Sequence, residues 1–286
     1  MSESIVESAG FDLGAYFKRI GWEGERRADL ATLKGVHLAH ARSIPFENLD
    51  ALRRTAPSLD PVDLMAKLVH SRRGGYCYEH NTLFSLALDA LGFRMTRLAA
   101  RVAVGADRLE SRPRTHMALL VEAPGDPGPY LADVGFGAVG ALLEPVPLRA
   151  DTEFRDAGRR HRLVRVPHRG PLEMWMLQAY EVQAYQERSG GWADQYAFTV
   201  EPFEKPDFEV INWHVATNPR SPFTQQLYVQ RTTAERHLHL YGRLLTETRA
   251  DDGTVTEREV TDEAEARRIL DEEFLIAAPG SMTLLG

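Results

Sequence analysis

The chain has 286 residues, of which 43% are hydrophobic, and its 41 acidic and 34 basic side chains give a formal charge of −7. This length allows a sizeable core and indicates two or three domains. No Lys/Arg-rich run is long enough to indicate a nucleic-acid surface, no apolar run is long enough to cross a bilayer, and no signal peptide is evident. The single cysteine excludes an intrachain disulfide and suits a reducing compartment, so we expect a soluble, cytoplasmic protein.

The first third of the chain has mostly helical patterns. Helices are predicted over residues 12–20, 29–42 and 61–70. Gly74 and Gly75, which can adopt the backbone angles of a sharp turn, precede a fourth predicted helix that ends at Gly92. Cys77 therefore lies in the first turn of a helix, where unpaired N–H groups and the positive end of the helix dipole stabilise a thiolate. It is a candidate nucleophile, although a lone cysteine is more often a buried small hydrophobic residue.

The rest of the chain is richer in strands. Strands are predicted at 97–104, 116–121, 162–166, 172–182 and 192–200, with a loop at 124–129 and a hairpin turn at Ser189-Gly190-Gly191. A Pro-marked segment, 202–219, comes next. It is followed by strands at 225–232 and 237–246, a hairpin turn at 252–253 and a helix at 261–275. This order indicates a helical segment, a β-rich middle and a smaller α/β end.

A nucleophilic thiolate needs a base, and the base needs a group that orients it. His116 begins an apolar run that is typical of a buried strand, and Asp133 ends a strand-like stretch at a glycine turn. Two adjacent strands would place the imidazole beside the carboxylate. Taken singly, these residues are more often a packed core histidine and a turn aspartate. Together with Cys77, and with each residue at the boundary of a predicted element, they make a catalytic triad as well supported as purely structural roles.

Four motifs resemble those of the arylamine N-acetyltransferase family. They are RGGYCYEHN at 73–81, SIPFENL at 43–49, Thr115-His116, and DVGFG at 133–137. They stand in the family's order, and the 39 positions from Cys77 to His116 and 17 from His116 to Asp133 are similar to those of bacterial, especially actinobacterial, members. The resemblance runs from about Phe11 to beyond Phe223 and implies that Cys77, His116 and Asp133 form the family's catalytic triad.

The resemblance also implies an α+β multidomain fold. We expect an N-terminal helical bundle that carries the nucleophile (1–93) and a central antiparallel β-barrel that carries the histidine and the aspartate (94–200). An interdomain segment (201–219) and a C-terminal α/β lid (220–286) would follow. The triad would lie where the first two domains meet, as in cysteine proteases.

Further site residues follow from the same resemblance. Substrate contacts are expected at Phe46, Tyr78, Phe136 and Phe223, where core packing is the alternative for each phenylalanine. Coenzyme A contacts are expected at Thr115, Thr217 and Ser221, the last two of which also suit turn or cap chemistry. Ala216 and Asn218 stand where actinobacterial members tend to have Ser and His. Structural support for the nucleophile turn is expected from Glu47, Arg73, Gly74 and Gly75.

We expect no metal site. His37 and His40 have helical spacing, but no third ligand is evident near them, so packed or solvated side chains are the simpler interpretation.

The expected activity is transfer of an acetyl group from acetyl-CoA to an arylamine, arylhydrazine or N-hydroxyarylamine, by a ping-pong mechanism through acetyl-Cys77. One alternative is an amide synthase that closes a macrolactam from a carrier-bound polyketide. A cysteine hydrolase and a non-catalytic binding protein are further alternatives. The physiological acceptor, the preferred acyl length and the oligomeric state stay open.

Overall fold

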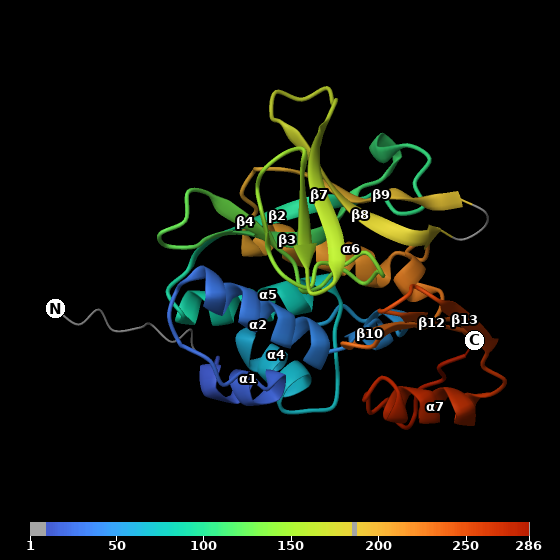
Figure 1. Ribbon diagram of the computed structural model, residues 1–286. Coiled ribbons are helices and arrows are strands. Elements are labelled where there is room, and N and C mark those ends of the chain that lie inside the picture. Colours follow the sequence, from blue (N-terminus) through green and yellow to red (C-terminus); the bar gives the residue numbers. More distant parts are fainter. Residues whose placement is uncertain (1–9, 185–187, 286) are drawn as a thin grey trace.

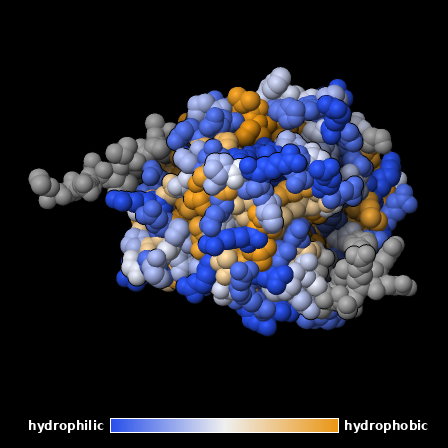
Figure 2. All heavy atoms as spheres, turned by 90° about the horizontal axis from the view of Figure 1, so that it is seen from above, coloured by the Kyte–Doolittle hydropathy of each residue, from blue (hydrophilic) through white to orange (hydrophobic). Residues whose placement is uncertain are grey.

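The computed structural model describes residues 10–184 and 188–285, which form three groups of elements (Figure 1). N-terminal helices lie below an eight-stranded sheet, and a second sheet with its own helix lies beside the helices (Figure 1). In the view from above, hydrophilic residues surround scattered apolar groups (Figure 2). Within the described ranges, no helix has both the length and the apolar character that crossing a membrane requires.

The N-terminal group consists of helices whose starts follow from local sequence signals. They are α1 (Leu13–Ile20), α2 (Leu30–Ser43), α3 (Leu49–Leu52), α4 (Pro61–Leu64), the π-helical turn η1 (Met65–Val69) and α5 (Cys77–Ala90). Asp12 and Asp29 cap α1 and α2 by accepting hydrogen bonds from the backbone N–H groups three residues further on. The helices predicted in this region are confirmed, although the second half of the third is π-helical.

An eight-stranded antiparallel sheet follows, with the strand order β5-β4-β3-β2-β9-β8-β7-β6. Its strands are β2 (Arg94–Val102), β3 (Arg114–Glu122), β4 (Pro129–Ala132), β5 (Val146–Pro147), β6 (Thr152–Asp156), β7 (Arg159–Val166), β8 (Met174–Ala184) and β9 (Arg188–Thr199); η2 (Leu109–Ser111) is a short 3-10 turn. The sheet curls so far that Ala150, between the two edge strands in sequence, bridges to Leu163 of β7. A nearly closed barrel results.

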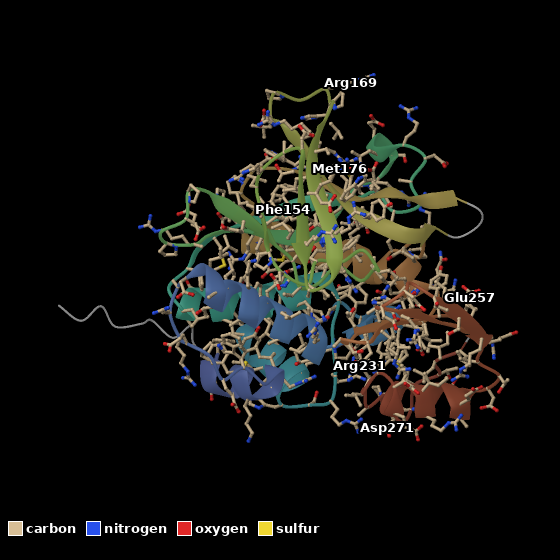
Figure 3. All side chains as sticks on the ribbon, in the orientation of Figure 1. Phe154, Arg169, Met176, Arg231, Glu257 and Asp271 are labelled. Atoms are coloured by element: carbon tan, nitrogen blue, oxygen red, sulfur yellow. The ribbon has the colours of Figure 1, made fainter. Side chains whose placement is uncertain are left out.

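The two faces of this sheet bury different clusters. Phe154 packs against the cluster that contains Leu98 and Tyr196, whereas Met176 belongs to a second, smaller cluster (Figure 3). On β3, Met117 packs against the helices, so the alternation of side chains along the strand places His116 on the opposite face.

The hairpin turn predicted at Ser189-Gly190-Gly191 is wrong. These residues belong to β9, where Ser189 pairs with Gln183 and Gly191 pairs with Glu181 of β8. The connection itself, 185–187, lies outside the described residues. Glycines form a turn only where the ladder of backbone hydrogen bonds ends, and here the ladder continues through them.

The C-terminal group is a five-stranded antiparallel sheet with the order β1-β10-β11-β12-β13. Its elements are β1 (Phe46–Glu47), β10 (Tyr228–Thr232), β11 (Arg236–Tyr241), β12 (Leu244–Arg249) and β13 (Val255–Glu259), with α7 (Glu263–Glu272). The single strand predicted at 237–246 is wrong, because Gly242, at φ 57°, turns the chain between β11 and β12. The turn at 252–253 and the final helix are confirmed.

Two features of this region were not predicted. Strand β1 comes from the N-terminal part of the chain and pairs with β10, with Phe46 opposite Gln230. The Pro-marked segment contains a 13-residue helix, α6 (Lys205–Thr217), and the 3-10 turn η3 (Pro222–Thr224) follows it. The proline within α6 lies in its first turn, where a helix tolerates the missing N–H.

Candidate active site

The turn before α5 presents Cys77 as the first residue of that helix. Gly74 and Gly75 are needed there for space. A Cβ atom on Gly74 would lie 1.9 Å from the carbonyl oxygen of Pro45, and one on Gly75 would lie 2.7 Å from Oε2 of Glu79. Neither glycine has a positive φ, so the predicted reason for the pair, unusual backbone angles, is wrong. The glycines let the turn pack directly against its neighbours.

We expect Gly74→Ala to destabilise the protein by about 2 kcal/mol, because the added methyl group meets backbone, which cannot rotate away. The free energy of unfolding from urea titration measures this effect. Gly128→Ala is the matched control, since a Cβ atom there meets nothing within 4 Å and Gly128 has no positive φ. Equal stability of the two variants would contradict the packing argument.

The three predicted triad residues come together where α5 meets the barrel. Nε2 of His116 lies 2.6 Å from Oδ2 of Asp133, and Sγ of Cys77 lies 3.9 Å from the carbonyl oxygen of Thr115. Cys77, His116 and Asp133 are only 4%, 3% and 1% exposed. Strands β3 and β4 are neighbours, as the sequence predicts, and they bring His116 and Asp133 into contact.

The histidine and the aspartate stabilise each other's charge. Burial lowers the pKa of His116, but the charge and hydrogen bond of Asp133, together with an interaction with Cys77, outweigh it and raise the pKa to about 10. Burial raises the pKa of Asp133, yet His116 and hydrogen bonds from Asn81 and Gly135 hold that pKa below its ordinary value. Nε2–H of His116 therefore donates to an ionised carboxylate.

Protonation of His116 should make stability depend on pH. Since its pKa is about 10 in the folded protein and 6.5 is the ordinary value, the folded state binds this proton more tightly. The contribution is fully present below pH 6.5 and is lost as pH rises through about 10. Urea unfolding of the wild type and His116→Gln should show a stability difference that shrinks over this range. An unchanged difference would contradict the assignment, and surface variant His168→Gln is the control.

Asp133 is held by residues that the sequence did not identify as part of the site. Its Oδ1 accepts from Nδ2 of Asn81 and from the N–H of Gly135, both at 2.9 Å. Its own N–H donates to Nε2 of His37 at 3.1 Å, so the proton of that ring is on Nδ1, which donates to the carbonyl oxygen of Leu143 at 2.9 Å. His37 is fully buried, which confirms a packed side chain.

A sequence signal existed for one of these two supports. Asn81 lies four positions after Cys77, on the same face of α5. No sequence signal pointed to His37, because its hydrogen-bond partner Asp133 is 96 positions away.

The predicted aromatic residues separate into two groups. Phe46, Phe136 and Phe223 are close to the site: the rings of Phe46 and Phe223 are 5.8 Å apart, and Phe136 makes an edge contact with His116 at 5.0 Å. Phe46 and Phe136 line a cavity of about 30 Å³. Tyr78 instead is fully buried, and its hydroxyl donates to the carbonyl oxygen of Thr115 at 2.5 Å.

The three predicted coenzyme A residues lie in three different parts of the fold. Thr115 lies on β3 next to His116, whereas Thr217 ends α6 and Ser221 lies just before η3. The hydroxyl of Thr217 donates to the carbonyl oxygen of Trp213 at 2.7 Å, a back-bond within the helix.

A cavity of about 330 Å³ between the barrel and the second sheet is lined, among the described residues, by none of the predicted site residues.

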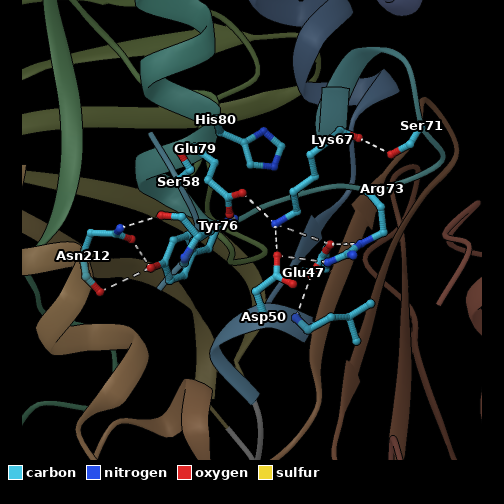
Figure 4. A network of polar contacts seen from close by, with 12 residues as sticks. Glu47, Asp50, Ser58, Lys67, Ser71, Arg73, Tyr76, Glu79, His80 and Asn212 are labelled. Atoms are coloured by element: carbon cyan, nitrogen blue, oxygen red, sulfur yellow. Dashed lines mark hydrogen bonds and ion pairs between the residues drawn. The ribbon is translucent and has the colours of Figure 1, made fainter. Parts of the chain in front are cut away.

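The predicted ion pair between Glu47 and Arg73 is present, with 2.7 Å between Oε1 and Nε. It belongs to a larger cluster beneath the nucleophile turn, which also contains Asp50, Lys67 and Glu79 (Figure 4). We call these five residues the ionic cluster. As for metals, the described ranges contain no group of three or more His, Cys, Asp or Glu side chains that could hold an ion.

Comparison with known proteins gives one consistent result. A family model described as N-acetyltransferase matches residues 29–281. The arylamine N-acetyltransferase of Mycolicibacterium smegmatis is 42% identical over 236 residues, 82% of this chain and 81% of that protein. The Escherichia coli enzyme of that name is 34% identical over 267 residues, 92% of this chain and 88% of its own.

Solved structures agree with the sequence comparisons. The crystal structure of Nocardia farcinica arylamine N-acetyltransferase superposes with a TM-score of 0.86 at 42% identity and covers 95% of this chain and 92% of that chain. The Mycobacterium marinum enzyme in complex with CoA superposes with a TM-score of 0.83 at 34% identity, covering 93% of each chain.

Proposed function

This chain belongs to the arylamine N-acetyltransferase family, and from that membership we propose that it carries an acetyl group from acetyl-CoA to an aromatic acceptor through Cys77. The acceptor is the nitrogen of an arylamine or arylhydrazine, or the oxygen of an N-hydroxyarylamine. One observation supports the route most strongly: His116 and Asp133 form a buried 2.6 Å hydrogen bond beside the only cysteine of the sequence.

The first half-reaction forms an acetyl-enzyme. Nδ1 of His116 holds the proton given up by the Cys77 thiol, and Asp133 stabilises this imidazolium through Nε2–H, in accord with the raised pKa of His116. The Cys77 sulfur attacks the carbonyl carbon of the thioester, a new C–S bond forms, and the C–S bond to coenzyme A breaks. The coenzyme A sulfur leaves with a proton from His116. Backbone N–H groups in the first turn of α5 are the natural donors to the developing oxyanion.

The second half-reaction discharges the acetyl group. The acceptor nitrogen attacks the carbonyl carbon of acetyl-Cys77, and His116 takes the proton that the nitrogen loses. The Cys77 sulfur then leaves, and the acetylated product dissociates. Weakly basic aromatic amines suit this step because they are largely unprotonated near neutral pH.

The acceptor ring is proposed to bind against Phe46, Phe136 and Phe223. Phe136 contacts His116 edge-on, so a ring beside it would lie next to the reacting carbonyl. The cavity at Phe46 and Phe136 has about 30 Å³, room for about one water molecule. Binding of an aromatic ring therefore requires that the cavity widen.

The acyl donor is proposed to contact Thr115, Thr217 and Ser221. Support comes from the position of Thr115 beside the triad and from the related Mycobacterium marinum structure in complex with CoA. The hydroxyl of Thr217 uses its proton within the helix and keeps an acceptor lone pair. We propose that the enzyme works in the cytoplasm, where a single free thiol stays reduced.

Intact-mass spectrometry tests the proposal. Brief incubation with acetyl-CoA should add one acetyl group, which peptide mapping should place on Cys77, and an arylamine such as an aminobenzoate should then remove it. An unchanged mass with acetyl-CoA, while iodoacetamide still labels Cys77, would show a reactive thiol with the wrong donor. That result would favour a macrolactam-forming amide synthase instead.

A further inference from the structure

The ionic cluster beneath the nucleophile turn has more acids than bases. Among the described residues, Glu47, Asp50 and Glu79 form ion pairs with Lys67 and Arg73 alone (Figure 4). The two basic residues form ion pairs with different members of the three acidic residues. Nε of Arg73 lies 2.7 Å from Oε1 of Glu47, and Nη2 of Arg73 lies 3.2 Å from Oδ2 of Asp50. Nζ of Lys67 lies 2.5 Å from Asp50 and 2.6 Å from Glu79, so among the described residues Lys67 alone forms an ion pair with Glu79.

Glu79 connects this cluster to the nucleophile. Its Oε1 accepts from Lys67, while its Oε2 accepts from the N–H of Tyr76, the residue immediately before Cys77, at 3.1 Å. This is the N-terminal cap of α5, made by the third residue of the helix. The backbone of Gly75 packs closely against this carboxylate, because a Cβ atom on Gly75 would lie 2.7 Å from Oε2 of Glu79. The position of the Glu79 carboxylate therefore determines the course of the backbone into Cys77.

Lys67 reaches Glu79 from an unusual helical turn. It lies in the middle of η1, which is closed by a hydrogen bond from the N–H of His70 to the carbonyl oxygen of Met65, five residues back. A π-helical turn inserts an extra residue into a helix and is frequently found at functional sites. Met65 and Leu68 are buried in the core, while Lys67 points into the ionic cluster (Figure 4).

We propose that Lys67 is a positioning residue of the acetyl-transfer reaction, which holds the Glu79 carboxylate against the N–H of Tyr76 and thereby fixes the turn that carries Cys77. The role rests on the proposed function of Cys77, and it is distinct from that of the Glu47–Arg73 pair. Arg73 orders β1 and α3 through Glu47, whose second oxygen accepts from the N–H of Leu49. Lys67 orders the N-terminus of α5.

Removal of Lys67 leaves the buried carboxylate of Glu79 without its positively charged partner. Burial already raises the pKa of Glu79 to about 7, even with Lys67 opposing that change. Without the ammonium group, Glu79 takes up a proton or turns toward solvent, and in both cases its hydrogen bond to Tyr76 weakens. A turn that is no longer held misplaces the thiol relative to His116, and a misplacement of about 1 Å can reduce a rate by about 100-fold.

A double-mutant cycle with Lys67→Met, Glu79→Gln and the double variant tests this proposal. The glutamine of the second variant keeps an oxygen that can accept from Tyr76 but carries no charge that needs Lys67. Two rates are measured per folded molecule: alkylation of Cys77 by iodoacetamide, and kcat/KM for acetyl-CoA. Thermal unfolding of each variant shows how much of it is folded. Lys34→Met, at a partly exposed lysine on α2, is the control.

Lys67→Met should slow both reactions by about 10- to 100-fold. The same substitution in the Glu79→Gln background should have little further effect, and Lys67→Arg should restore most of the rate. Additive effects of the two substitutions would overturn the proposal, because they would show that the charge of Lys67 acts on the thiol directly. A lower melting temperature with unchanged rates per folded molecule would also overturn it.

The alkylation rate separates this proposal from the function of the enzyme. If wild-type Cys77 is not acetylated by acetyl-CoA, the proposed acyl donor is wrong, but the cycle measured with iodoacetamide still reports whether Lys67 and Glu79 position the thiol. If acetylation occurs and the cycle is additive, only the role of Lys67 fails.

Discussion

Cys77→Ser is expected to reduce acetyl transfer to an arylamine by at least about 10⁴-fold, with no acetyl-enzyme detectable by mass spectrometry. Serine preserves the size of the side chain at the first position of α5, so the fold should be retained. A hydroxyl is a much weaker acid than a thiol and is a poorer leaving group in the second half-reaction. The substitution should therefore slow both half-reactions, the one that forms the bond to the acetyl group and the one that breaks it.

Two measurements make this result specific. The melting temperature of Cys77→Ser should stay close to that of the wild type, since serine and cysteine differ by one atom of similar size. Transfer that persists at a tenth or more of the wild-type rate would show that the acetyl group does not pass through residue 77. Direct transfer from acetyl-CoA to the acceptor would then replace the ping-pong route.

Asp133→Asn should reduce acetyl transfer by about 10⁴-fold while leaving Cys77 in place. The asparagine amide of this variant would donate to Nε2 of His116, where the carboxylate of the wild type accepts at 2.6 Å. The imidazole proton then moves to Nδ1, and Nδ1 can no longer take the thiol proton. The pKa of His116 falls as well, because the charge of Asp133 is a main cause of its rise to about 10.

The matched control for this substitution is Asp126→Asn. Asp126 also accepts a hydrogen bond from a side chain, the hydroxyl of Tyr130 at 2.9 Å, but it lies in the loop before β4 and away from the triad. Its variant should keep full activity. NMR titration of His116 would show whether its pKa falls in Asp133→Asn, and a fully active variant with an unchanged pKa would contradict the triad.

Local signals in the sequence were sufficient for most of the helices. Asp12 and Asp29 cap α1 and α2 through hydrogen bonds to residues three positions away, so the information is contained in one turn of chain. The same holds for Cys77 at the start of α5. Signals of this kind failed at Ser189-Gly190-Gly191 and at 237–246, because whether a glycine turns the chain depends on where the partner strand ends.

The sequence by itself predicted Cys77, His116 and Asp133 as nucleophile, base and orienting carboxylate, because each stands in a short motif that resembles those of the family. The tertiary structure alone decided what holds them. His37 reaches Asp133 across 96 positions, Phe46 of β1 pairs with Gln230, and η1 directs Lys67 at Glu79. Such contacts depend on how distant segments pack, and local spacing encodes no distance between segments that meet only in the folded chain.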